Sequence, residues 1–133
     1  MAERVYCLYR GKNQESILMQ KNACHDFTEK KGWNIVGEEQ EIGVSGYKAC
    51  ADDRVKLQRI RKAVEQGEFD ILLVFMYDRL GRNLNETPFI AKWFTKKGIH
   101  VWSVYEGEII DGVDAERMLD YIRSWQTDEA QKL

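Results

Sequence analysis

Hydrophobic residues follow two alternating patterns along this chain of 133 residues. Runs rich in aliphatic, β-branched and aromatic residues predict four strands, at about 3–9, 33–42, 70–77 and 99–105. Between and after them, apolar residues at helical spacing predict four helices, at about 16–32, 53–67, 88–97 and 114–130. Strands that alternate with helices imply a mostly parallel sheet covered on both faces. We therefore expect an α/β fold, a three-layer α/β/α sandwich with a mostly parallel central sheet of four or five strands.

Polar residues and glycines mark the expected ends of these elements. Ser16 is expected to cap the first helix, which ends near Gly32. Thr87 is expected to cap the third helix, with Pro88 at its first position. The segment 106–108 is expected to start a loop. Asp52 or Asp53 is expected to cap the second helix, whose inward apolar positions are predicted to be Val55, Leu57, Ile60, Ala63 and Val64.

Composition limits the classes of partner. Charged residues make up 32% of the chain and hydrophobic ones 44%, which is typical of a globular protein, and the length favours a single domain over residues 1–133. The formal net charge is −2, so no global basic field attracts nucleic acid, and any DNA contact must come from a local patch. No apolar run reaches the length of a membrane span, and no signal peptide opens the chain.

Cysteines and histidines give no sign of a metal site. Cys7, Cys24 and Cys50 are widely spaced and lack paired metal-ligand spacing. Cys7 and Cys24 fall at positions expected to be buried, which favours a reduced, cytoplasmic protein. His25 and His100 have no acidic or thiol companion at ligand spacing, so each is interpreted as an ordinary helix or strand residue. We expect no metal and no cofactor.

The most distinctive polar residues follow the most apolar strand. The run 71–74 is typical of a strand buried on both faces, and Asp78, Arg79 and Arg82 come soon after it. Ligands of open α/β sheets bind outside the carboxyl ends of the strands. Two guanidinium groups three residues apart suit one phosphodiester, and Gly81 between them allows a tight turn. The competing interpretation is a solvated loop with an internal ion pair.

Asp78-Arg79-Leu80-Gly81-Arg82 after a hydrophobic strand resembles the signature of the serine recombinase family, which comprises resolvases, invertases and phage-type integrases. The stretch 43–106, with Gly43-Val44-Ser45-Gly46-Tyr47-Lys48 and the run 67–74, resembles the large-recombinase (integrase) branch. The resemblance implies a resolvase-like catalytic domain that acts on DNA without metal. In that family a serine at the end of the first strand attacks the phosphodiester, and arginines hold it.

The resemblance also assigns roles to individual residues. The residues that match catalytic positions are Arg10, Gln20, Arg54, Asp78, Arg79 and Arg82. Lys12, Gln14 and Ser45 are further candidates for binding phosphate or lining the site. On this interpretation the arginines grip the scissile phosphate, while Asp78 orients them and helps to protonate the leaving group.

The chain departs from the family at the nucleophile. Where the family has Arg-Val-Ser, this chain has Arg10-Gly11-Lys12, and lysine cannot form the phosphoserine linkage. Ser16 is the nearest hydroxyl but is better explained as a helix cap. Tyr9 is better explained as a strand residue and Ser45 by loop hydrogen bonding. We therefore expect a domain that has lost its nucleophile and binds phosphate without cleaving the strand.

Partners and rival functions follow from the same features. The resemblance implies DNA as the partner, a bacterial or phage-encoded source and a homodimer or tetramer formed through the last helix, whose apolar stripe fits core packing as well. We expect the chain to contain the catalytic domain without the family's DNA-binding region. A non-catalytic, DNA-associated dimerisation or regulatory module is the alternative. A small-molecule α/β enzyme is a third possibility, but the glycine-rich phosphate loops are missing.

Overall fold

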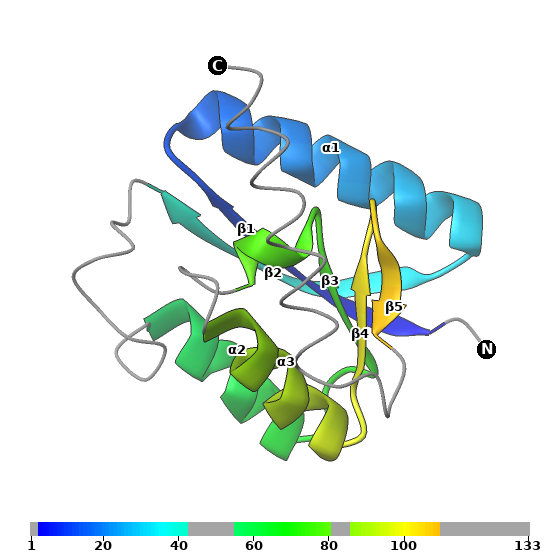
Figure 1. Cartoon of the computed structure of the whole chain (residues 1–133). Helices are drawn as coiled ribbons and strands as arrows, with labels where there is room; N and C mark the ends of the chain where they lie inside the picture. The colour runs from blue at the N-terminus through cyan, green and yellow to red at the C-terminus, as the bar shows by residue number, and fades with distance from the viewer. Residues whose placement is uncertain (1–2, 43–54, 81–85, 110–133) are drawn as a thin grey trace.

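The computed structural model of the chain describes residues 3–42, 55–80 and 86–109, which form a five-stranded sheet with helices on both faces (Figure 1). The strand order is β2-β1-β3-β4-β5. The first four strands in this order run parallel, and β5 pairs antiparallel with β4. The strands are β1 (Arg4–Gly11), β2 (Asn34–Ile42), β3 (Ile71–Val74), β4 (His100–Ser103) and β5 (Gly107–Ile109). The predicted α/β fold, with a mostly parallel sheet of four or five strands, is confirmed.

Within the described ranges, three helices and one 3-10 turn connect the strands. They are α1 (Gln14–Lys31), α2 (Val55–Glu65), η2 (Tyr77–Arg79) and α3 (Glu86–Lys96). In Figure 1, α1 covers one face of the sheet, while α2 and α3 lie together on the other. The helix expected at 114–130 and the loop expected at 43–51 fall outside the described residues.

Alternation along the strands supplies a core on each side of the sheet. Leu8, Leu72 and Val74 belong to the cluster that includes α2 and α3 residues such as Ile60 and Phe94. The neighbouring strand positions face α1 and form a second cluster with it. Its strand residues are Val5, Cys7, Tyr9, Ile71 and Leu73, and its α1 residues are Ile17 and Cys24. All four residues of β3 are buried, because this strand lies inside the sheet with a helix layer on either side. The burial predicted for Cys7 and Cys24 is confirmed.

Two predicted helix caps and one predicted core position are wrong. Asn13, not Ser16, caps α1: its side chain accepts a hydrogen bond from the Ser16 backbone nitrogen at 2.9 Å. Thr87 is not a cap, because α3 begins at Glu86 and Thr87 is buried in its first turn. Val55 does not face the core, since 59% of it is exposed.

Two further expectations fail at the carboxyl edge of the sheet. The strand expected to reach Tyr77 ends at Val74, and Tyr77 opens η2 instead. The loop expected at 106–108 contains the short strand β5, in which Gly107 has φ of 87°. The chain reverses direction between β4 and β5, so β5 runs antiparallel to β4 at the outer edge of the sheet.

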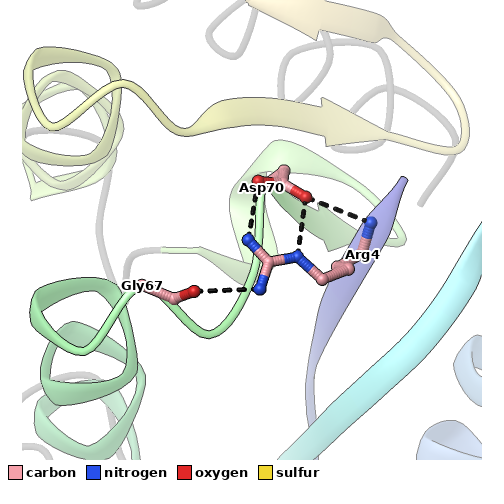
Figure 2. Close-up of polar contacts among 3 residues, drawn as sticks. All are labelled: Arg4, Gly67 and Asp70. Carbon is pink, nitrogen blue, oxygen red and sulfur yellow. Dashed lines mark hydrogen bonds and ion pairs between the residues drawn. The ribbon is translucent and has the colours of Figure 1, made fainter. Parts of the chain in front are cut away.

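At the opposite, amino edge of the sheet, one arginine joins β1 to the start of β3. The Arg4 guanidinium donates to both carboxylate oxygens of Asp70, through Nε and Nη2, each at 3.0 Å. Its Nη1 donates to the Gly67 carbonyl at 2.9 Å, as Figure 2 shows. Hydrogen bonding from Arg4 holds the pKa of Asp70 below its usual value.

This ion pair predicts a pH dependence of stability. Because the pKa of Asp70 is lowered by folding, its contribution is present at neutral pH and is lost as pH falls through the folded-state pKa. Asp70→Asn should therefore reduce the free energy of unfolding modestly at pH 7, since the pair is solvent-exposed. Urea denaturation of both proteins between pH 7 and pH 2.5 measures this difference. A difference that grows toward acid pH would contradict the prediction.

Candidate active site at the carboxyl edge of the sheet

Two arginines meet where β1 and β3 end. Arg10 is the next-to-last residue of β1, and Arg79 is the last residue of η2, which follows β3. The Arg10 Nε donates to the Arg79 carbonyl at 3.3 Å, and the Arg79 Nη1 donates to the Arg10 carbonyl at 3.4 Å. Each side chain is therefore held against the main chain of the other, and both are half-buried. Holding two cations together in this way favours an anionic ligand.

Gln20 fixes the strand position that carries Arg10. Its side-chain oxygen accepts from the Arg10 backbone nitrogen at 3.1 Å, and its Nε2 donates to the Arg10 carbonyl at 2.8 Å. Gln20 is completely buried on α1, so its amide satisfies main-chain groups that water cannot reach. The structure thus places Gln20 beside Arg10, with both ends of its amide bonded to the Arg10 backbone. That contact suits positioning of Arg10.

Ser16 lies against Gly11 on the α1 side of the strand. A Cβ atom added to Gly11 would lie 2.5 Å from the Ser16 Oγ and 2.8 Å from the Ser16 Cβ. The Ser16 hydroxyl also accepts a hydrogen bond from Gln20 Nε2 at 3.2 Å. Gly11 is therefore required by the close approach of α1 to the end of β1.

This contact predicts a compensating pair of substitutions. Gly11→Ala should destabilise the fold by about 1–3 kcal/mol, because the new methyl overlaps both side-chain atoms of Ser16. Ser16→Gly removes both atoms, so the double variant should recover much of that loss. Thermal unfolding of the two single variants and the double variant measures the coupling. Strictly additive effects would show that the two side chains do not clash.

The remaining side chains near Arg10 differ in accessibility. Lys12 and Gln14 are exposed just beyond the end of β1. Tyr9 is buried on the α1 side, and its hydroxyl donates to the Glu38 carboxylate at 2.6 Å. Burial raises the pKa of Tyr9, which keeps the phenol protonated and agrees with its interpretation as a strand residue.

Other predicted site residues fall outside what the structure describes. Arg54, Ser45 and Arg82 lie in ranges whose structure is not described. Asp78 is the middle residue of η2, so its backbone lies between Tyr77 and Arg79, and its side chain is not described. Among the described residues, the structure thus brings Arg10, Arg79 and Gln20 together.

The sequence interpretation missed Glu106 and Ser103, which hold η2 from the connection between β4 and β5. The Glu106 carboxylate accepts from the Tyr77 backbone nitrogen at 3.0 Å, and Ser103 accepts from the Glu106 nitrogen at 2.7 Å. Only the spacing of a serine three residues before a glutamate after a strand hinted at such a turn.

Known proteins resemble this chain both in sequence and in fold. The family model "Resolvase, N terminal domain" matches residues 10–132. The chain belongs to the resolvase family. The N-terminal catalytic domain of TP901-1 integrase is similar in structure, with a TM-score of 0.74 and 26% identity over 95% of this chain and 98% of that one. The predicted resemblance to serine recombinase catalytic domains is confirmed.

Two more distant structures share the fold of this resolvase-family chain. A resolvase family site-specific recombinase from Streptococcus pneumoniae has a TM-score of 0.69 and 21% identity, covering 97% of this chain and 91% of its own. The C-terminal catalytic domain of ISC1926 TnpA, an IS607-like serine recombinase, has a TM-score of 0.66 and 23% identity, covering 97% and 84%. A search of curated proteins gives no match.

Within residues 3–42, 55–80 and 86–109, no group of three or more His, Cys, Asp and Glu side chains is arranged to hold a metal ion. None of the helices in these ranges has the length and apolar character needed to span a bilayer.

Proposed function

We propose that this chain is the catalytic domain of a site-specific DNA recombinase, and that its arginines hold a DNA phosphodiester. The observation that carries the proposal is the reciprocal contact of Arg10 and Arg79 at the carboxyl edge of the sheet. Guanidinium groups bind phosphate through charge-assisted hydrogen bonds, and in an edge site they need no metal to neutralise its charge. Arg54 and Arg82 complete this cationic site, and Asp78 orients it.

We further propose that the chain binds DNA without forming a covalent link to it. Arg10-Gly11-Lys12 has no serine two residues after the arginine, where the family nucleophile stands. Lys12 is exposed next to the end of β1 and adds a cation to the site. The Ser16 hydroxyl accepts a hydrogen bond from Gln20 and the Tyr9 hydroxyl donates one to Glu38, so each hydroxyl has a structural contact within the fold. Ser45 is better explained by loop hydrogen bonding than as a nucleophile.

The assembly and setting belong to the same proposal. Residues 1–133 form one resolvase-type catalytic domain, which pairs into a homodimer or tetramer through the helix predicted at 114–130. Its partner is the DNA backbone, and its setting is the cytoplasm of a bacterium or a phage-infected cell.

A salt titration tests the proposal. Fluorescence anisotropy of a labelled duplex, measured from 25 to 200 mM salt, should show binding that weakens steeply, because phosphate contacts release counterions. The plot of log affinity against log salt should have a slope of about −0.9 for each phosphate contact. Binding that is absent at low salt, or that does not respond to salt, would sink the proposal.

A non-catalytic dimerisation or regulatory module remains the second candidate, because the usual serine is missing. The two candidates differ in what DNA binding depends on. A retained active site requires Arg10 and Arg79 for binding, whereas a module that binds DNA elsewhere does not. Titration of a variant that lacks both arginines separates them.

A further inference from the structure

The 3-10 turn that carries Arg79 is held from the β4–β5 connection. Glu106 Oε1 accepts from the Tyr77 backbone nitrogen at 3.0 Å and from the Ser103 hydroxyl at 3.0 Å. The Ser103 Oγ in turn accepts from the Glu106 backbone nitrogen at 2.7 Å. Ser103 is completely buried and Glu106 is half-buried, so the hydrogen bonds between this serine, this glutamate and η2 are partly shielded from water.

The connection is itself tied to the chain that leaves β3. The Val104 nitrogen donates to the Val74 carbonyl at 3.0 Å, and the Tyr105 nitrogen donates to the Phe75 carbonyl at 3.4 Å. The rings of Phe75 and Tyr105 meet edge to face, with centroids 5.5 Å apart. The connection therefore extends the pairing of β4 past the end of β3 and offers a rigid support.

The support acts on η2 at its first residue. The Tyr77 backbone is held by Glu106, and the Tyr77 hydroxyl donates to the Gly107 carbonyl. From there η2 makes its own turn, with the Arg79 nitrogen bonded to the Met76 carbonyl at 2.9 Å. Arg79, at the end of this turn, reaches Arg10. A shift of Tyr77 would thus be transmitted to Arg79 within two residues.

We propose that Glu106 is a positioning residue for the active site, which fixes η2 and thereby aims Arg79 at the phosphate. This inference rests on the proposed function. One carboxylate oxygen receives both a main-chain and a hydroxyl donor, and such charge-assisted bonds are stronger than neutral ones. In this role Glu106 acts through the backbone of Tyr77.

Three variants test the proposal. Glu106→Ala removes the acceptor, and Glu106→Gln keeps an acceptor oxygen of the same reach. Glu108→Ala is the matched control, because Glu108 lies on β5 of the same hairpin and pairs with His100 at 2.9 Å instead of with η2. NMR of each protein without DNA gives the exchange rate of the Tyr77 amide and the Nε resonance of Arg79. DNA titrations alongside include Arg79→Ala as the reference.

The expected pattern is specific to Glu106. Glu106→Ala should speed Tyr77 amide exchange about tenfold or more, displace the Arg79 Nε resonance and weaken DNA binding toward the level of Arg79→Ala. Glu106→Gln should restore most of each property, and Glu108→Ala should leave all of them near wild type. An unmoved Arg79 resonance in Glu106→Ala, or equal changes in Glu108→Ala, would overturn the positioning role. Normal DNA binding by Arg79→Ala would instead overturn the proposed function. In that case the Tyr77 amide exchange rate and the Arg79 Nε resonance still test whether Glu106 positions η2.

Discussion

Replacing Arg10 and Arg79 together by alanine should weaken DNA binding by a factor of about a hundred to ten thousand at low salt. Each guanidinium would contribute a charge-assisted contact to phosphate, and a bond of this kind is typically worth about 1.5–3 kcal/mol. The salt dependence should also become shallower by nearly two units of slope, because each lost phosphate contact removes about 0.9. Anisotropy titrations of a duplex at several salt concentrations measure both quantities.

Arg4 provides the control for this experiment. It stands at the opposite end of the same strand, and its guanidinium is paired with Asp70. Arg4→Gln removes one positive charge, as each active-site substitution does, but it should leave the salt slope unchanged. Equal losses in the Arg4 variant would show that binding follows overall charge and that Arg10 and Arg79 form no specific site.

Gln20→Met should be the most damaging single substitution for stability near the site. Methionine fills a similar volume but leaves the Arg10 nitrogen without its amide acceptor and the Arg10 carbonyl with the longer contact from Arg79 Nη1 at 3.4 Å. A main-chain donor that loses its partner costs about 1–3 kcal/mol and the lost bond to the carbonyl about 0.5–1.5 kcal/mol, so the free energy of unfolding should fall by about 1.5–4.5 kcal/mol. Urea denaturation followed by tryptophan fluorescence measures the loss.

Neighbouring positions on α1 distinguish this effect from a general weakening of the helix. Met19 is 47% exposed one residue before Gln20, so Met19→Gln should change stability by less than about 0.5 kcal/mol. A small loss of stability in Gln20→Met would mean that water or a local rearrangement satisfies the Arg10 backbone. The two hydrogen bonds from the Gln20 amide would then contribute little to the free energy of unfolding.

The hydrophobic pattern predicted β1 and β3 well because apolar residues dominate both strands. The run 71–74 is buried in full, as a strand with helices on both faces must be, and the alternation along β1 matches the two core clusters. The ends of elements were harder to predict. Asn13 and Ser16 are both good caps by residue type, and the continuation of β1 to Gly11 decided in favour of Asn13.

The candidate site was only partly predictable. Arg10 and Arg79 are distant in sequence, and their convergence follows from the parallel pairing of β1 with β3. The positions flanking Arg10 required the structure, because the roles of Gly11 and Gln20 depend on how closely α1 approaches the strand. Glu106 was missed because a glutamate after a strand is usually a solvated loop residue, and its spacing from Ser103 was a weak hint of the turn.

The central claim is that a resolvase-type phosphodiester site survives here without its nucleophile. The most direct measurement joins this chain, unaltered or carrying Lys12→Ser, to the DNA-binding region of an integrase whose recombination site is known. The intact integrase serves as the positive control, and denaturing gels detect protein that remains attached to DNA. We predict no adduct with the unaltered chain and an adduct with the Lys12→Ser variant, where a hydroxyl again stands two residues after Arg10. An adduct with the unaltered chain would show that another residue attacks the phosphate, and failure of both chains beside a working control would show that the site is not competent.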